Sequence, residues 1–163
     1  MHKLLLVAAF VLAAALPADA FILTQPRLEQ IVKESPELSL THLSGREYVS
    51  VKGDGNELGY LDASAIDYGF QADKADILIV PLISGGSGGV FTTLIFTTMH
   101  GEPTFVGKID SNGHLDVHLS AGVINAVTPT YGPKDPQAFP SGHHVVRYAV
   151  HAGKLVKIDE FRG

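Results

Sequence analysis

The spacing of hydrophobic and polar residues changes once along the chain, about a third of the way in. Before that point, Leu28, Ile31 and Val32 fall on one face at helical spacing, shortly after Pro26, which suits a helix start. Another proline closes the pattern. These positions predict a short amphipathic helix over residues 26–35, docked through one apolar stripe.

From Arg46 onward the pattern is that of β-strands. "REYVSV" runs into a Gly-Asp-Gly-Asn turn, and "GGVFTTLIFTTM" is rich in β-branched and aromatic residues. "ADILIVPLI" is continuously apolar, which predicts a strand covered on both faces. Pro81 interrupts this run, and because proline lacks an N–H we expect it at an edge, a bulge or a strand end.

The second half of the chain reads as further short strands and turns. "EPTFVGKI" and "GHLDVHLSA" are joined by a turn with Asn112-Gly113, which predicts a hairpin. "HVVRYAVHAGKLVKIDEF" alternates on both sides of Ala152-Gly153 and predicts a closing hairpin. Residues 128–141 carry several prolines and predict a long ordered loop. The expected fold is α+β, mainly antiparallel β-sheet built from hairpins with one short N-terminal helix.

The first twenty residues have the organisation of a secretory signal. Lys3 precedes an apolar run that ends before Pro17, and Ala18-Asp19-Ala20 forms a small-x-small cleavage site. The run is shorter than the ~20 residues of a membrane-spanning helix. We therefore expect cleavage after residue 20, a single exported domain over 21–163 without an integral membrane segment, and a secreted or periplasmic location.

Composition narrows the chemistry further. The chain has no cysteine, which excludes disulfides, thiolate zinc sites and a lipidated N-terminus. Its net charge is −5, without a run of lysines or arginines, so nucleic acid is not an expected partner. The sequence implies no cofactor and leaves the partner unknown.

"FPSGHH" contains Pro-Ser-Gly-His, the central signature of PAP2-type phosphatidic acid phosphatases. That family also needs Lys-x6-Arg-Pro upstream and Ser-Arg-x5-His-x3-Asp downstream, on a helical scaffold. Neither flanking motif is present, and the segment reads as a loop entering a strand. We interpret Pro140-Ser141-Gly142 as a turn that delivers the chain into its penultimate strand, although a hydrolase using His143 stays as an alternative.

"ISGGSGG" is a glycine-rich segment between two predicted core strands. It contains Gly-x-Ser-x-Gly around Ser87, the spacing of a nucleophile elbow, but a strand-like segment follows where the elbow needs a helix. A Lys-Ser/Thr pair for a phosphate loop is also missing. A hairpin loop is the favoured interpretation, with an anion-binding backbone nest or a hydrolase using Ser87 as alternatives.

Histidines and carboxylates form the candidate metal site. On a strand, His114, Asp116 and His118 share the face opposite Leu115 and Val117. Imidazole and carboxylate suit Zn, Cu or Ni, although i and i+4 on a strand lie ~13 Å apart. A further ligand would have to come from another strand, for which His144 and His151 are candidates. The alternative is a polar outer sheet face. The aspartates at 62, 67, 73 and 76 and the "KGDGNELG" segment fit no calcium template and favour solvated turns.

The order of strands and turns resembles the LppP/LprE lipoprotein-type module. The matching pieces are Gly85 to Gly88, Gly101 to Pro103 and Gly132 to Pro136, and the resemblance covers residues 75–158. The chain departs from that family in lacking the lipobox cysteine and the later cysteines. The resemblance implies an exported α+β domain and transfers no catalytic residue.

Three functions follow, in order of preference. The first is a non-enzymatic envelope or extracellular binding module that uses the glycine-rich loop, the proline-rich loop and the outer sheet face. The second is a metal-binding protein that uses His114, Asp116 and His118. The third is a hydrolase.

Overall fold

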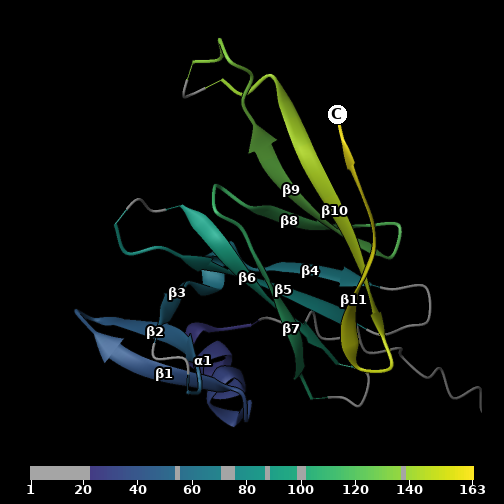
Figure 1. The fold of residues 1–163 in the computed structure, drawn as a ribbon. Helices are drawn as coiled ribbons and strands as arrows, with labels where there is room; N and C mark the ends of the chain where they lie inside the picture. The colour runs from purple at the N-terminus through teal and green to yellow at the C-terminus, as the bar shows by residue number, and fades with distance from the viewer. Residues whose placement is uncertain (1–22, 54–55, 71–75, 87–88, 99–101, 137–138) are drawn as a thin grey trace, which may run out of the picture.

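The protein is described here from a computed structural model that covers residues 23–53, 56–70, 76–86, 89–98, 102–136 and 139–163. The predicted leader lies outside these ranges. The elements are α1 (Gln25–Glu34), β1 (Leu38–Leu43), β2 (Arg46–Val51), β3 (Glu57–Leu61), η1 (Ala63–Ala65), β4 (Asp67–Phe70), β5 (Asp76–Ile83), β6 (Val90–Thr97), β7 (Thr104–Asp110), β8 (Asp116–Ser120), β9 (Val123–Thr130), β10 (Gly142–His151) and β11 (Lys154–Arg162). The α+β prediction is confirmed: one short helix precedes antiparallel strands in two sheets (Figure 1).

The strands form a larger sheet A and a smaller sheet B. Sheet A has the order β1-β2-β3-β5-β6-β7, with β4 pairing β5 beside β3. Sheet B has the order β11-β10-β9-β8. No helix in the described ranges is long and apolar enough to cross a membrane.

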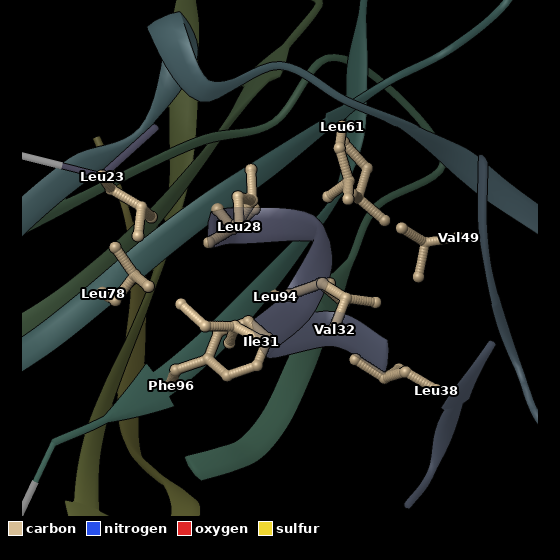
Figure 2. Packing of buried hydrophobic residues seen from close by; sticks show 12 residues of the cluster. Leu23, Leu28, Ile31, Val32, Leu38, Val49, Leu61, Leu78, Leu94 and Phe96 are labelled. Carbon is tan, nitrogen blue, oxygen red and sulfur yellow. The ribbon is translucent and has the colours of Figure 1, made fainter. Parts of the chain in front are cut away.

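Helix α1 covers one face of sheet A, as the apolar stripe predicted. Leu28, Ile31 and Val32 are buried against sheet residues that include Leu94 and Phe96 (Figure 2). The helix starts with Pro26 in its first turn, which needs no intrahelical N–H partner there.

Sheet B covers the other face of sheet A. Ile77, Ile79 and Ile95 pack there against Val117 and Ile124 of sheet B, whereas the alternate residues of β5 and β6 face α1. The molecule thus has three layers, and the prediction that the "ADILIVPLI" strand is covered on both faces is confirmed.

Pro81 differs from its expected place, because it lies inside the central strand β5. β4 pairs with β5 up to Ile79 and β3 pairs from Leu82 onward, so Pro81 lies between two partners on that side. The missing N–H therefore removes no ladder hydrogen bond to β3 or β4.

Two sequence predictions about the sheets were wrong or incomplete. The Asn112-Gly113 turn does not close a hairpin, because β7 belongs to sheet A and β8 to sheet B. The backbone amides of Ser111 and Leu115 donate instead to Phe91 and Val90 of β6, and the chain crosses between sheets here. Strands β1, β3, β4 and β9 were not predicted.

The closing hairpin was predicted correctly. β10 and β11 are paired from His144 opposite Arg162 to His151 opposite Lys154, and the register shifts by a bulge between Arg147 and Tyr148. Ala152 and Gly153 both have positive φ, at 49° and 72°, which matches the twist of a two-residue hairpin.

Candidate functional site

The metal candidates lie at the edge of sheet B. Asp116 and His118 belong to β8 and point away from the core, whereas Leu115 and Val117 are buried, as the alternation predicted. Oδ2 of Asp116 lies 3.9 Å from Nδ1 of His118, and the two side chains are 70% and 45% exposed. His114 is exposed in the segment before β8.

His144 and His151 were candidates for a further metal ligand from a strand next to β8, and the strand order does not place them there. β9 lies between β8 and β10, so His144 and His151 are not on a strand adjacent to β8. Nε2 of His144 is 3.0 Å from Oε2 of Glu160. Within the part of the chain that the structure describes, no three histidine, aspartate or glutamate side chains converge as a metal site would require. The metal hypothesis therefore stays a prediction for His114, Asp116 and His118, of which Asp116 and His118 are the pair that the structure brings within 3.9 Å.

The outer face of sheet B carries a row of polar side chains. Strand register aligns His118, Asn125, Arg147 and Asp159 across the four strands. Nε of Arg147 donates to Oδ1 of Asp159 at 2.6 Å, and the second guanidinium nitrogen donates to Oδ2. This hydrogen bonding lowers the pKa of Asp159. The Arg147 guanidinium also lies over the ring of Phe161, 5.8 Å from its centroid. Arg147 is thus already engaged within the sheet.

The proline-rich loop between β9 and β10 is ordered by one carboxylate. The amides of Gly132 and Ser141 donate to Oδ2 of Asp135 at 2.6 and 2.7 Å. The pKa of Asp135 is lowered below its ordinary value, chiefly by the hydrogen bond from the Gly132 amide and also by hydrogen bonds from Ser141. Tyr131 and Phe139 are 53% and 73% exposed on this loop, which projects from the body of the molecule (Figure 1).

The "FPSGHH" segment enters β10, the penultimate strand, as predicted. β10 begins at Gly142, and the backbone N–H of His143 donates to Gly163 at 3.0 Å, while Gly163 donates back. His143 therefore belongs to a strand and lacks the helical setting of the phosphatase motif.

The glycine-rich loop connects β5 to β6 as a hairpin. The amide of Ser84 donates to the carbonyl of Gly89 at 2.9 Å, and β6 starts directly afterwards at Val90. The prediction that a strand follows Gly-x-Ser-x-Gly is confirmed, and a nucleophile elbow would need a helix there. Ser87 itself lies outside the described residues.

The first residues of this loop line a groove that was not predicted from the sequence. The groove has a volume of about 460 Å³ and lies between the β1–β2 turn and the glycine-rich loop. We call it the Tyr48 groove; its lining residues are Leu43, Ser44, Tyr48, Leu58, Gly59, Ser84 and Gly85.

Two glycines allow the chains around Tyr48 to approach closely. A Cβ on Gly85 would lie 3.0 Å from the Tyr48 hydroxyl, and a Cβ on Gly59 would lie 2.9 Å from the Ile83 carbonyl oxygen. Gly59 also has a φ of 148°, which other residues rarely adopt. The wall of the groove therefore depends on these two positions lacking side chains.

The Tyr48 ring is held by a second aromatic ring. Tyr48 and Tyr60 are paired across β2 and β3, and their ring centroids are 5.8 Å apart in an edge-to-face arrangement. The Arg46 guanidinium lies 4.2 Å from the centroid of the Tyr60 ring. These two contacts restrict the orientation of the Tyr48 and Tyr60 rings.

A second hollow of about 320 Å³ lies on the Tyr60 side of this ring pair. We call it the polar hollow; its lining residues are Gln25, Glu29, His42, Gly45, Arg46, Glu47, Tyr60, Leu61 and Asp62. Nδ1 of His42 is 2.8 Å from Oε1 of Glu47. Hydrogen bonds from the Ser64 side chain and amide lower the pKa of Asp62.

Both hollows were missed because their residues are scattered along the chain. Tyr48 and Tyr60 belong to neighbouring strands, and Ser84 and Gly85 follow β5. Each strand reads separately as an ordinary sheet element. The one available signal was the glycine-rich loop, which sequence reasoning included in a binding surface without identifying its aromatic partner.

Comparisons with known proteins returned no matching family model, no matching curated protein and no matching solved structure. The resemblance to the LppP/LprE lipoprotein-type module therefore stays a hypothesis, carried by the order of strands and turns.

Proposed function

We propose that this protein is an exported, non-enzymatic binding module that holds a ligand in the Tyr48 groove. The supporting observation is a preformed concave site with a fixed aromatic wall. Its volume of about 460 Å³ falls within the range of about 300–1,000 Å³ that is usual for small-ligand sites. The groove thus has a size that suits a small ligand, and one wall is formed by the paired Tyr48 ring.

The lining chemistry favours binding over catalysis. The described residues around the Tyr48 groove include no carboxylate, imidazole or ammonium group. A general acid or base needs such a group within hydrogen-bond reach of the reacting atoms. The hydroxyl groups of Ser44, Tyr48 and Ser84 have no neighbouring base among the lining residues, so they orient a ligand instead of attacking it.

The proposal that the protein is exported is based on the N-terminal segment of the sequence. Residues 1–20 have the basic start, apolar run and small-x-small site of a cleaved leader. Expression with this segment intact should release a protein that begins at Phe21. Edman sequencing of the product tests this, and a product that keeps residue 1 would contradict the proposal.

Two neighbouring glycines provide a test of the groove itself. Gly85→Ala places a methyl group 3.0 Å from the Tyr48 hydroxyl, whereas Gly86→Ala places one in open space, and neither glycine has a positive φ. Ligand-observed NMR would screen neutral oligosaccharides, capped neutral peptides and uncharged heterocycles against both variants. We expect at least one probe class to bind wild type and Gly86→Ala but not Gly85→Ala. Equal behaviour of the two variants towards every class would contradict the proposal.

A further inference from the structure

We infer that the outer edge of β1 binds an extended basic peptide, which joins sheet A as an added strand and places a lysine or arginine side chain in the polar hollow. This inference goes beyond the proposed function, because Leu40, His42 and Glu47, which carry it, do not line the Tyr48 groove. The partner is a protein segment that the sheet holds by its backbone and selects by its charge.

The outer edge of β1 has backbone groups that no described strand uses. β1 is a terminal strand of sheet A and pairs on one side, with β2 (Figure 1). The amide of Lys52 donates to the carbonyl of Glu37 at 2.9 Å, which marks these two residues as a bonded pair just before β1. Bonded positions alternate along an antiparallel strand, so the N–H and C=O groups of Leu40 and His42 point away from β2.

β1 also lacks the features that protect the other terminal strands. β11 carries Lys154 and Lys157 and has a bulge in its pairing with β10. β7 lies against β11, where Gly107 approaches Leu155, and β8 is the shortest terminal strand and lies near β4. β1 has no proline and no charged residue, and its register with β2 is continuous. Because sheet edges are usually blocked by such features, an unblocked edge is suited to receive a further strand.

The polar hollow beside this edge has an excess of negative charge. Glu29, Glu47 and Asp62 line it, and among its described lining residues Arg46 alone carries a permanent positive charge. Glu29 accepts a hydrogen bond from a neutral amide side chain, and the neighbour of Glu47 is His42, whose charge depends on protonation. The Glu47 side chain is only 19% exposed, so it attracts a cation more strongly than a fully hydrated carboxylate does. The hollow therefore favours a cationic side chain.

The register of β1 places the hollow next to the outward-pointing backbone of His42. His42 lies opposite Glu47 in the β1–β2 pairing, and both line the polar hollow. Leu40, two residues earlier on the same strand face, packs against the core under α1. An added strand lies ~4.8 Å from β1 and presents alternate side chains to this face. The site thus selects a basic residue beside His42 and an apolar residue two positions away, beside Leu40.

A second copy of this chain is the competing occupant, and its charge disfavours it. β1 carries no lysine or arginine, so pairing β1 with itself would place no cation in either polar hollow. It would also bring together two hollows that each have an excess of carboxylates. A basic peptide supplies the missing charge and avoids this repulsion.

The test uses short capped peptides that alternate valine and threonine, with lysine, norleucine or glutamate at the centre. By isothermal titration calorimetry, we expect the lysine peptide to bind at least about tenfold more tightly than the norleucine peptide, and the glutamate peptide to bind most weakly. Glu47→Gln should remove the preference for lysine over norleucine. Glu34→Gln makes the same change of charge at an exposed position of α1 outside the hollow and should keep that preference.

Two N-methylated forms of the lysine peptide test strand addition without any change to the protein. Methylation of one alternate set of peptide amides blocks the bonds to β1, whereas methylation of the other set leaves them intact. We expect one methylated peptide to bind like the parent peptide and the other to lose binding. NMR should show the parent peptide shifting the amides of Leu40 and His42. Equal behaviour of the two methylated peptides would overturn the inference.

The remaining outcomes separate this inference from the proposed function. Gly85→Ala crowds the wall of the Tyr48 groove and should leave peptide binding unchanged, so each proposal can fail without the other. A lysine preference that does not depend on Glu47 would contradict the peptide inference. So would a polyamine that binds as tightly as the peptide, because the hollow would then act without the edge. A dimer with exchange-protected amides at Leu40 and His42 would assign the edge to a second copy.

Discussion

Sheet A and sheet B have the same antiparallel construction, but they differ in how many faces are covered. α1 and sheet B bury the two faces of sheet A, so β5 and β6 are buried on both sides. Sheet B has one covered face, and its other face carries the polar row with Arg147 and Asp159. The difference shows that sheet A is the structural centre of the molecule.

The same comparison explains where the groove lies. The core between the sheets contains residues of β5, β6 and β7 and none from β1, β2 or β3 among the described residues. Figure 1 shows β1 and β2 extending away from sheet B. The face of these strands that is opposite α1 therefore carries Tyr48 and Tyr60 instead of a second apolar layer, and the Tyr48 groove lies beside Tyr48.

The largest expected effect is the difference in stability between two alanine variants, one at a phenylalanine of sheet A and one at a phenylalanine of sheet B. Phe96 in sheet A is fully buried, whereas Phe161 in sheet B is 51% exposed. Phe96→Ala should lower the free energy of unfolding by about 3–5 kcal/mol, because it leaves a cavity beside α1. Phe161→Ala should cost less than about 1 kcal/mol. Urea denaturation measures both, and similar losses would contradict the contrast between the sheets.

The next effect tests how closely the two sheets approach at β7 and β11. A Cβ on Gly107 would lie 3.1 Å from Cβ of Leu155, and Gly107 has a φ of 153°. Gly107→Ala should destabilise the fold by about 1–3 kcal/mol through crowding and backbone strain. Gly113→Ala, which meets open space, is the matched control and should stay within about 0.5 kcal/mol in thermal denaturation. An equal loss in the control would overturn this explanation.

A smaller effect with opposite signs is expected at two adjacent threonines of β6. Oγ1 of Thr93 is buried without a hydrogen-bond partner, whereas Oγ1 of Thr92 donates to Asp110 at 2.9 Å. Thr93→Val should stabilise the protein by about 1 kcal/mol, because it removes an unsatisfied polar group. Thr92→Val should destabilise it by a similar amount. Calorimetric melting temperatures that move in the same direction would refute this assignment.

The smallest effect concerns the proline-rich loop at the open end of sheet B. The pKa of Asp135 is lowered by bonds from Gly132 and Ser141, so the carboxylate stabilises the loop fully above the ordinary value of 3.8. This contribution is lost as pH falls through the lower, folded value. NMR should show the amides of Gly132 and Ser141 losing their bonded shifts in acid, while the His143–Gly163 pair persists. Simultaneous loss at all these sites would indicate global unfolding instead.

Some features were predictable because they depend on local spacing. Leu28, Ile31 and Val32 recur at helical intervals. The turn of the β10–β11 hairpin is recognisable in the sequence from Ala152-Gly153 between two alternating segments. β9 escaped prediction because Pro129 lies within it. Pro129 is tolerated because β8 pairs with β9 no further than Val127, so among the described residues no strand pairs with that side of β9 beyond Val127.

The amino-acid sequence by itself determined the helix, the strand character of the later chain and the double burial of β5, since each follows from the period of apolar residues. Only the tertiary structure decided that the Asn112-Gly113 turn leads from one sheet into the other, and that Tyr48 meets Gly85. Local sequence sets backbone preference over a few residues. Which strands become neighbours depends on how the whole set of apolar faces can be buried together, and that is decided only when the layers pack.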